Sequence, residues 1–267
     1  MIEQEILQQM VAAAEAVGQK VLAQPRPGAF RTLDELRRVF GEFDQPLQRQ
    51  LWERLHPLVP AALSFEELEG ALPAGDVWII DALDGAIQYL HDLPQWCVNL
   101  TLVRDRVPLL AVLHSPTLNE TYAARAGGGA TRNGRPIAPA QKSELAAAFT
   151  ATSQPPFVGR LPRQVELAGR SLAAMLAAVG AVRNLGATSW QVADVGGGRL
   201  DAFWEYGVDD VNLLGAALIA QEAGAVVSDA AGQPWRAGAG SILVAAPSLH
   251  ARLQALMPPD AGAAALG

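Results

Sequence analysis

The sequence is poor in cysteine and in long apolar runs. One cysteine, Cys97, occurs among 267 residues, so the chain cannot form an internal disulfide, and we expect this side chain to pack in a core. No run of about 18 apolar residues is found, which argues against a membrane-spanning helix. The start, Met1 to Glu5, lacks the basic residues of a secretory signal. These absences predict a soluble, cytoplasmic protein.

Basic residues are also scarce. The chain has 20 Lys and Arg against 27 Asp and Glu, its formal net charge is −7, and no segment gathers basic residues into a stripe. Because nucleic acids attract proteins through clustered positive charge, this distribution predicts that nucleic acid is not a partner. Apolar residues, in contrast, make up 50% of the chain. A chain of this length should bury a genuine core, as one large domain or two closely packed halves.

Apolar periodicity in the first half predicts helices followed by strands. Spacings of three and four predict an amphipathic helix over residues 3–24 and a second helix over about 47–55. From Val77 onwards, the runs "VWII", "VNLTLV" and "LLAVLH" are rich in branched side chains and predict strands. The glycine-rich segment 127–139 predicts a turn region, and the Ala-rich stretch after it predicts a helix.

The second half alternates between the two periodicities. Helical patterns over 171–179 and 189–197 alternate with the strand patterns "LDAFWE", "AVVSD" and "SILVAA". Such alternation predicts a layered α/β architecture. We expect an N-terminal α+β subdomain over 1–140 and a C-terminal α/β subdomain over 141–267. The tail 258–267 has no amphipathic pattern and is expected to be frayed.

The segment "VWIIDALDGA" carries the clearest chemical signal. An apolar strand ends in Asp81, and Asp84 and Gly85 follow in a turn. This spacing can bring the two carboxylates together at the mouth of a sheet, where they could share a hard cation such as Mg²⁺. The amides of Gly85 and Ala86 would open the next helix and face a phosphate. Taken alone, the pattern favours a turn and a helix N-cap over a metal site.

Further polar residues precede and follow this segment. Glu66 and Glu67 stand close enough before Asp81 for a loop to return a carboxylate to the same site, although their spacing alone favours the solvated face of a short helix. A second group lies just before a helix that Gly224 could terminate: Glu205, Asp209, Asp210 and Asn212.

At this point the sequence resembles the inositol monophosphatase family of magnesium-dependent, lithium-sensitive phosphatases. The family signature Asp-Pro-(Ile/Leu)-Asp-Gly-Thr-x-Asn-Phe is matched by "DALDGAIQY" after Trp78. Similar segments follow at His91, Pro94, "SPTLNETYAARAGGGATRNGRPI", 183–186, "GRLDAFWE" and "GAALIAQEAG". The resemblance spans about 40–247 and implies the family's layered αβαβα sandwich, with most metal ligands in the N-terminal subdomain.

The resemblance also implies a set of metal ligands. In the family these are a Glu of a Glu-Glu pair, both Asp residues of the signature, a backbone carbonyl between them, and a later Asp before a helix. The first four fall on Glu66, Asp81, the carbonyl of Leu83 and Asp84. The implied cofactor is Mg²⁺, and relatives are often homodimers.

The later Asp of the family falls on an asparagine. Counting back from Glu222 and counting forward from Glu205 both lead to Asn212. An Asn carbonyl can ligate Mg²⁺ but adds no negative charge, so a second cation should bind more weakly. Asp209 or Asp210 could replace it if the loop is rearranged. An ordinary helix N-cap is the alternative role for Asn212.

Two other family positions differ. The signature Thr, whose hydroxyl helps to position the attacking water in the family, is Ala86 here, and the family's Asn-Phe is Gln88-Tyr89. In the segment "FGEFDQPLQRQL" the family's Asp is retained as Asp44, but its Thr is Gly41.

The resemblance assigns roles to the remaining residues. Glu66 and Asp84 are the implied catalytic residues, with Glu66 steering the water. The amides of Gly85 and Ala86 are implied to bind phosphate. Substrate hydroxyls are implied to meet a second set: Gly186, Ala187, Thr188 and Glu205. A surface position on a strand is the alternative for Glu205.

Two functions remain open on the sequence. The first is an Mg²⁺-dependent phosphomonoesterase acting on a small polyol or sugar phosphate by metal-activated water. The second is a catalytically impaired family member that binds a phosphorylated ligand, because Asn212 and Ala86 replace the family's Asp and Thr. The sequence favours the enzyme, does not identify its substrate, and leaves lithium sensitivity and oligomeric state open.

Overall fold

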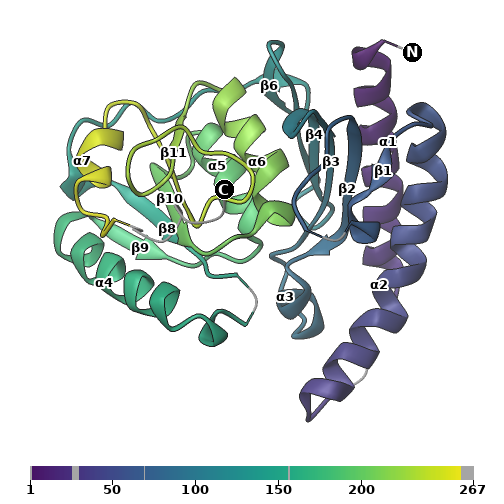
Figure 1. The fold of residues 1–267 in the computed structure, drawn as a ribbon, viewed down its shortest axis with the longest axis horizontal. Coiled ribbons are helices and arrows are strands. Elements are labelled where there is room, and N and C mark those ends of the chain that lie inside the picture. The colour runs from purple at the N-terminus through teal and green to yellow at the C-terminus, as the bar shows by residue number, and fades with distance from the viewer. Residues whose placement is uncertain (1, 26–29, 69, 156, 260–267) are drawn as a thin grey trace.

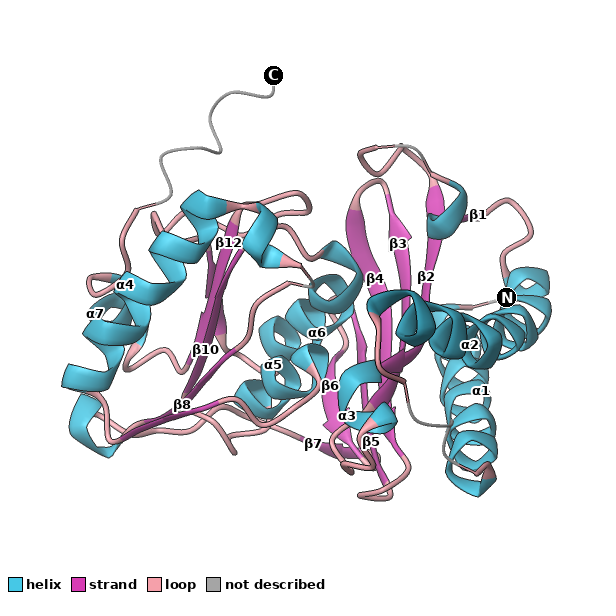
Figure 2. Cartoon of the chain, turned by 90° about the horizontal axis from the view of Figure 1, so that it is seen from below, coloured by secondary structure: helices cyan, strands magenta, loops and turns pink. Residues whose placement is uncertain are grey.

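The computed structural model describes residues 2–25, 30–68, 70–155 and 157–259. Two β-sheets stand side by side, and helices lie outside and between them (Figures 1 and 2). The helices are α1 (Glu3–Ala23), α2 (Leu33–Leu55), α3 (Ala86–Leu90), α4 (Pro162–Ala178), α5 (Thr188–Gly196), α6 (Asp210–Glu222) and α7 (His250–Gln254). The first sheet contains β1 (Leu63–Ser64), β2 (Asp76–Asp84), β3 (Cys97–Arg104), β4 (Val107–Ser115), β5 (Glu120–Arg125), β6 (Gly129–Arg132) and β7 (Arg135–Pro136). The second contains β8 (Phe149–Thr152), β9 (Ala181–Arg183), β10 (Ala202–Tyr206), β11 (Val226–Ser228) and β12 (Ser241–Ala245).

The helices form three layers around the two sheets. Helices α1 and α2 cover the outer face of the first sheet, α5 and α6 lie between the sheets, and α4 and α7 cover the far face of the second (Figures 1 and 2). Three buried apolar clusters follow this order, and the largest joins the first sheet, α5, α6 and the second sheet. The predicted layered αβαβα sandwich is therefore confirmed, because each sheet buries both faces against helices.

The first sheet keeps its strands in chain order, from β1 to β7. All neighbouring strands are antiparallel except β1 and β2. The strand predicted to end at Asp81 continues to Asp84 through a bulge, where Asp81 pairs with Asn99 and Asp84 with Cys97. A bulge re-aims side chains, and here it lets both aspartates face one cavity.

The second sheet has the order β11-β12-β10-β8-β9 and mixes parallel and antiparallel pairs. The helix predicted after residue 139 is wrong, because that stretch contains only a 3₁₀ turn at Leu145–Ala147 before β8. Tertiary contacts override the helix propensity of alanine here. The backbone N–H of Phe149 donates to the buried Asp201 carboxylate at 2.6 Å, and β8 is inserted between β10 and β9.

The two predicted N-terminal helices are present, with one change in length. Helix α1 ends at Ala23, and Gln24 is extended, as expected before a proline. Helix α2 begins at Leu33, far before the predicted start, with the Thr32 hydroxyl accepting from the N–H of Glu35 at 3.2 Å. The apolar spacing of its second half continues through the first at Leu33, Leu36, Phe40 and Phe43, so the stripe extends further back along the chain than predicted.

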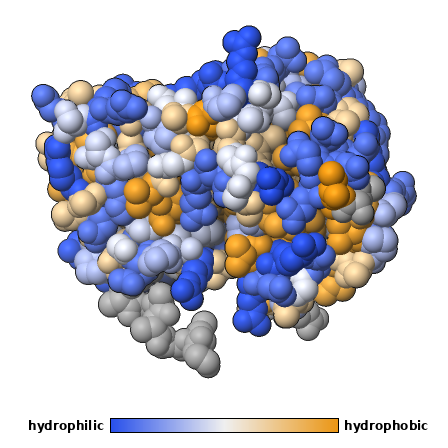
Figure 3. All heavy atoms as spheres, turned by 90° about the horizontal axis from the view of Figure 1, so that it is seen from above, coloured by the Kyte–Doolittle hydropathy of each residue, from blue (hydrophilic) through white to orange (hydrophobic). Residues whose placement is uncertain are grey.

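The chain end and the surface complete the fold. Residues 260–267 of the predicted frayed tail lie outside the described residues, whereas the Pro258 carbonyl accepts a hydrogen bond from the Tyr206 hydroxyl at 2.6 Å. On the face shown in Figure 3, apolar patches are small and interrupted by hydrophilic side chains. Within the part of the chain that the structure describes, no helix is both long and apolar enough to cross a membrane.

Candidate active site

A cavity of about 1020 Å³ lies where the two halves of the chain meet. Helix α2, the 3₁₀ turn Phe65–Glu67, β2 and α3 line it from the first half, and the starts of α5 and α6 line it from the second. Its wall carries six carboxylates: Asp44, Glu66, Glu67, Asp81, Asp84 and Asp209. Arg49 is the sole basic residue among the described residues that line it. Such an excess of negative charge requires a cation or protons to offset it.

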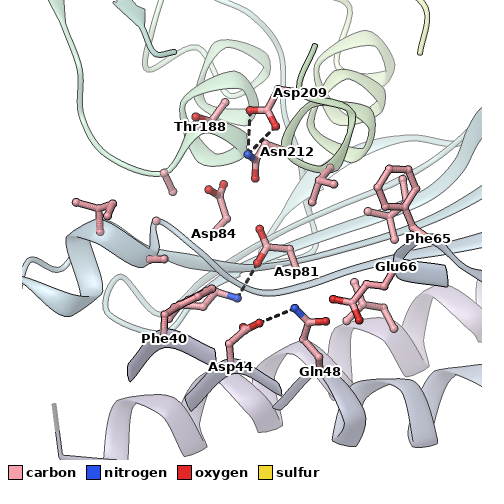
Figure 4. Close-up of a pocket in the computed structure, with 18 of the residues that line it drawn as sticks. Phe40, Asp44, Gln48, Phe65, Glu66, Asp81, Asp84, Thr188, Asp209 and Asn212 are labelled. Carbon is pink, nitrogen blue, oxygen red and sulfur yellow. Dashed lines mark hydrogen bonds between the residues drawn. The ribbon is translucent and has the colours of Figure 1, made fainter. Parts of the chain in front are cut away.

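Asp81 and Asp84 face each other across the bulge of β2 (Figure 4). The backbone N–H of Leu83 donates to Oδ1 of Asp81, with 2.9 Å between the atoms. Burial raises the pKa of Asp81 well above its usual range, and the neighbouring Asp84 carboxylate raises it further. The expected pairing of these two carboxylates is therefore present in the fold.

Asp84 is also held by the start of α5, in the second half of the chain. The backbone N–H of Ser189 donates to Oδ2 of Asp84 at 2.9 Å, and the Ser189 hydroxyl donates to the same oxygen. Burial raises the pKa of Asp84, while these hydrogen bonds act in the opposite direction. The sequence pattern gave no indication of Ser189, because its partner is 105 residues away along the chain.

Two glycines shape the backbone around the cavity. Gly85 precedes α3 with a φ of +88°, and a Cβ there would stand 2.6 Å from the Gln95 carbonyl oxygen. Gly186 has a φ of +125°, and the Gln191 side chain donates to its carbonyl oxygen at 3.0 Å. Both backbones require glycine. Five of the residues expected to contact phosphate or substrate line this part of the cavity: Gly85, Ala86, Gly186, Ala187 and Thr188.

Asn212 and Asp209 form a hydrogen-bonded pair at the start of α6. The Asn212 amide nitrogen lies 2.9 Å from each carboxylate oxygen of Asp209. Its Oδ1 is buried without a hydrogen-bond partner in the described residues and faces Asp84 and Asp81 (Figure 4). The N-cap alternative for Asn212 is wrong, since Asp209 occupies the N-cap position. Asp210 points elsewhere, because its carboxylate accepts from the N–H of Gly238 at 2.8 and 3.0 Å.

Glu66 and Asp44 lie on the opposite wall from α6 (Figure 4). Glu66 stands in the 3₁₀ turn Phe65–Glu67, is exposed, and lines the cavity as Glu67 does. Oδ2 of Asp44 accepts from the Gln48 side chain at 2.5 Å. Burial raises the pKa of Asp44 to about 6, although the bond from Gln48 lowers it, and Glu66 adds a small upward contribution.

Glu205 is placed differently from the other expected site residues. It lies on β10, is 1% exposed, and is absent from the cavity lining. The surface alternative for this residue is therefore wrong. Burial raises the pKa of Glu205 well above its usual range, and the nearby Asp209 and Asp84 raise it further.

The donor set fits a hydrated divalent cation. In the residues that the structure describes, no three His, Cys, Asp or Glu side chains are gathered tightly enough to enclose a metal ion. Mg²⁺ does not require such a cage, because it keeps several waters and is often held by one or two carboxylates. Asp84 supplies a buried carboxylate, Asp81 a half-buried one, and the unpartnered Oδ1 of Asn212 a neutral oxygen beside them.

Phe157 forms part of the cavity wall that the sequence did not indicate. Its ring lies 5.5 Å from the guanidinium carbon of Arg37 on α2 and 5.2 Å from that of Arg160. Cation–π contacts of this kind stabilise an aromatic ring near water. The contact with Arg37 therefore ties the loop after β8 to the first half of the molecule. Only the tertiary structure brings these residues together.

The metal-free protein should lose stability as pH rises through this site's titration range. The pKa of Asp44 and that of Asp209 are both raised to about 6, mainly by burial. Between about pH 4 and pH 6 the folded protein therefore keeps protons that the unfolded chain has released, so the free energy of unfolding falls as pH rises. For Asp44 the loss reaches about 3 kcal/mol at most. Thermal unfolding in EDTA from pH 4 to pH 8 measures this loss of stability as a fall in Tm.

Asp44→Asn is the matched variant for this measurement. It removes the titrating carboxylate and keeps an oxygen that can accept from Gln48. The difference in Tm between Asp44→Asn and the wild type should grow in favour of the variant as pH rises to 6. If Tm changed with pH equally in the two proteins, the proposed effect of the Asp44 carboxylate on stability would be contradicted.

Comparisons with known proteins identify the family of this chain and its fold. The profile of the inositol monophosphatase family matches residues 3–259. A Thermotoga maritima protein named fructose-1,6-bisphosphatase/inositol-1-monophosphatase is 31% identical over 73% of this chain and 73% of its own. A Pseudomonas aeruginosa protein named Nus factor SuhB is 30% identical over 72% of each chain. The solved structure of inositol monophosphatase from Anabaena is 27% identical, with a TM-score of 0.78 over 96% of this chain and 97% of that one.

Proposed function

Because the chain belongs to the inositol monophosphatase family, whose members are metal-dependent phosphatases, we propose that it is a Mg²⁺-dependent phosphomonoesterase. Its substrate is a small polyol or sugar phosphate. The observation that carries this proposal is the pair of carboxylates formed by the half-buried Asp81 and the buried Asp84, beside the unpartnered oxygen of Asn212. Oxygen ligands that face one acidic cavity are the chemistry that Mg²⁺ prefers.

The proposed metal ligands come from both halves of the chain. The ligand set comprises Glu66, Asp81, the Leu83 carbonyl, Asp84 and Asn212, of which Glu66 is the most exposed. When bound, Mg²⁺ supplies an activated water and stabilises the attacking and leaving oxygens of the phosphoryl group. Asp209 holds the Asn212 amide, so that the amide oxygen points toward the aspartates.

The chain's own groups bind and orient the substrate. The backbone amides of Gly85 and Ala86 line the cavity beside Asp84 and are proposed to bind phosphate oxygens. The segment Gly186–Thr188 lines the same cavity and is proposed to meet the substrate hydroxyls. Glu66 is proposed to orient the attacking water. Glu205 lies near Asp209, and its buried position on β10 gives it no direct contact with the cavity in this conformation.

A second function is favoured by two specific residues. Ala86 has no hydroxyl to orient water, and Asn212 contributes no negative charge. A family member with these changes could retain binding of a phosphorylated ligand while hydrolysis is impaired. Binding without turnover, measured with the same substrates, distinguishes it from the enzyme.

The test is phosphate release from a panel of phosphomonoesters across a Mg²⁺ titration. The panel contains inositol 1-phosphate, fructose 1,6-bisphosphate, histidinol phosphate and a nucleoside 3′-phosphate, and the matched control is Asp81→Asn. We expect turnover of at least one substrate that requires both Mg²⁺ and Asp81. Release no greater than the metal-free blank for every substrate, from a folded protein, would overturn the proposal.

A further inference from the structure

Ser189 is a buried residue that touches one of the proposed metal ligands through two of its own atoms. It is the second residue of α5 and is 0% exposed. Its backbone N–H lies 2.9 Å from Oδ2 of Asp84, and its hydroxyl donates to the same oxygen. The sulfur of the buried Cys97 lies 3.3 Å from the hydroxyl oxygen.

These contacts distinguish the two oxygens of Asp84. Oδ2 accepts both bonds from Ser189, and the Cys97 sulfur lies 4.0 Å from it. A carboxylate oxygen has about two lone-pair sites, and two hydrogen bonds occupy those of Oδ2, so it is a poor metal ligand. Oδ1 is then the oxygen of Asp84 that can bind a cation in the cavity. Asp84 is on β2 and Ser189 is on α5. The difference between the two Asp84 oxygens therefore depends on the packing of the two halves of the molecule.

We propose that Ser189 is a positioning residue that restricts Asp84 to one-oxygen ligation and thereby favours Mg²⁺ over Ca²⁺. The inference rests on the proposed metal site. Mg²⁺ demands near-ideal octahedral geometry, which a single carboxylate oxygen satisfies, whereas Ca²⁺ accepts six to eight oxygens and often takes both oxygens of a carboxylate. Without the hydrogen bond from the Ser189 hydroxyl to Oδ2, the Asp84 carboxylate can rotate and offer both oxygens to a cation. This should favour binding of Ca²⁺, the larger ion.

The test is calorimetric titration of the full chain with Mg²⁺ and with Ca²⁺, without substrate. In Ser189→Ala we expect Mg²⁺ to bind about 10-fold more weakly, as is usual when a residue supporting a metal ligand is lost. Ca²⁺ affinity should remain the same or increase. The dissociation constant of Mg²⁺ divided by that of Ca²⁺ should therefore rise. An unchanged ratio, or an equal loss for both ions, would overturn the inference.

Two controls and a second variant sharpen the result. Ser171→Ala removes another fully buried hydroxyl, whose oxygen accepts from Trp204 at 2.9 Å, and should leave both affinities unchanged. Cys97→Ala removes the sulfur next to the hydroxyl and should leave the ratio unchanged. If Ser189→Ala does not fold, Ser189→Cys has nearly the same size and a weaker donor, and should shift the ratio in the same direction.

The metal titration and the phosphatase assay test different proposals, so failure of one can be distinguished from failure of the other. Turnover in the wild type together with an unchanged ratio in Ser189→Ala overturns this inference and leaves the proposed function standing. A shifted ratio in a protein that releases no phosphate supports the role of Ser189 and overturns the phosphatase. A wild type that binds neither ion overturns the inference, and metal-independent turnover would then overturn the Mg²⁺ requirement as well.

Discussion

Asp81→Asn should lower metal-dependent phosphate release by at least about 100-fold, because the loss of a direct ligand should exceed the 10- to 100-fold loss typical of its supporting groups. The variant removes one of the two carboxylates that the bulge of β2 brings to the same cavity. The Asn oxygen can still accept from the N–H of Leu83, so the local backbone should be preserved. Initial rates at saturating Mg²⁺ measure the loss.

The same substitution should stabilise the metal-free protein. Burial raises the pKa of Asp81 well above its usual range, and Asp84 raises it further, so ionised Asp81 is unfavourable in the folded chain. Replacing the carboxyl with a neutral amide removes that cost, and Tm in EDTA near pH 8 should rise. Opposite changes in activity and stability are typical of a residue retained for function.

The matched control is Asp76→Asn, at the other end of the same strand. Asp76 forms an ion pair with Arg104 at 2.7 Å, outside the cavity. This variant should keep phosphate release within about twofold of the wild type, because surface ion pairs contribute little. Activity retained in Asp81→Asn, or lost equally in both variants, would contradict the assignment of Asp81.

Asn212→Asp should strengthen Mg²⁺ binding by about 10-fold or more and destabilise the metal-free protein. The added carboxylate supplies charge where the Asn oxygen now faces Asp81 and Asp84, and ligand charge tunes cation affinity. Without metal, the same charge would face Asp209 at the distance of the present hydrogen bonds, 2.9 Å, and Asp209 would lose its donor. A cost of about 2 kcal/mol would lower Tm by roughly 4 to 8 °C.

Exchanging the two residues provides the control for this prediction. The double variant Asp209→Asn/Asn212→Asp keeps the total charge and can form the same pair with donor and acceptor reversed. It should bind Mg²⁺ more tightly than the wild type without the loss in Tm. Equal Mg²⁺ affinity in the wild type and in both variants, measured by calorimetry, would show that position 212 does not contact the cation.

The impaired-enzyme alternative makes a distinct prediction for Ala86. If hydrolysis is limited by the missing charge and the missing hydroxyl, Asn212→Asp combined with Ala86→Thr should raise the rate of phosphate release above that of the wild type. Unchanged activity in a folded double variant would show that other groups already perform these roles.

Much of the fold was predictable because its elements are marked locally. The apolar stripe of α1 and the proline after it predicted both its extent and its end. The strand patterns predicted β2, β3 and β4, although the bulge that carries β2 on to Asp84 has no local marker. The helix predicted before β8 failed because strand pairing and the Asp201 carboxylate, both distant in sequence, outweigh the preference of alanine.

The site likewise contains features that the sequence predicts and features that depend on tertiary packing. The sequence by itself determined that Asp81, Asp84 and Gly85 stand together, because a strand and the turn after it place neighbouring residues within a few ångströms. Only the tertiary structure decided that Ser189 binds one oxygen of Asp84, that Asp209 turns the Asn212 oxygen into the cavity, and that Glu205 is buried. Hydrogen bonds between distant segments depend on how the two halves pack, and no local periodicity encodes that packing.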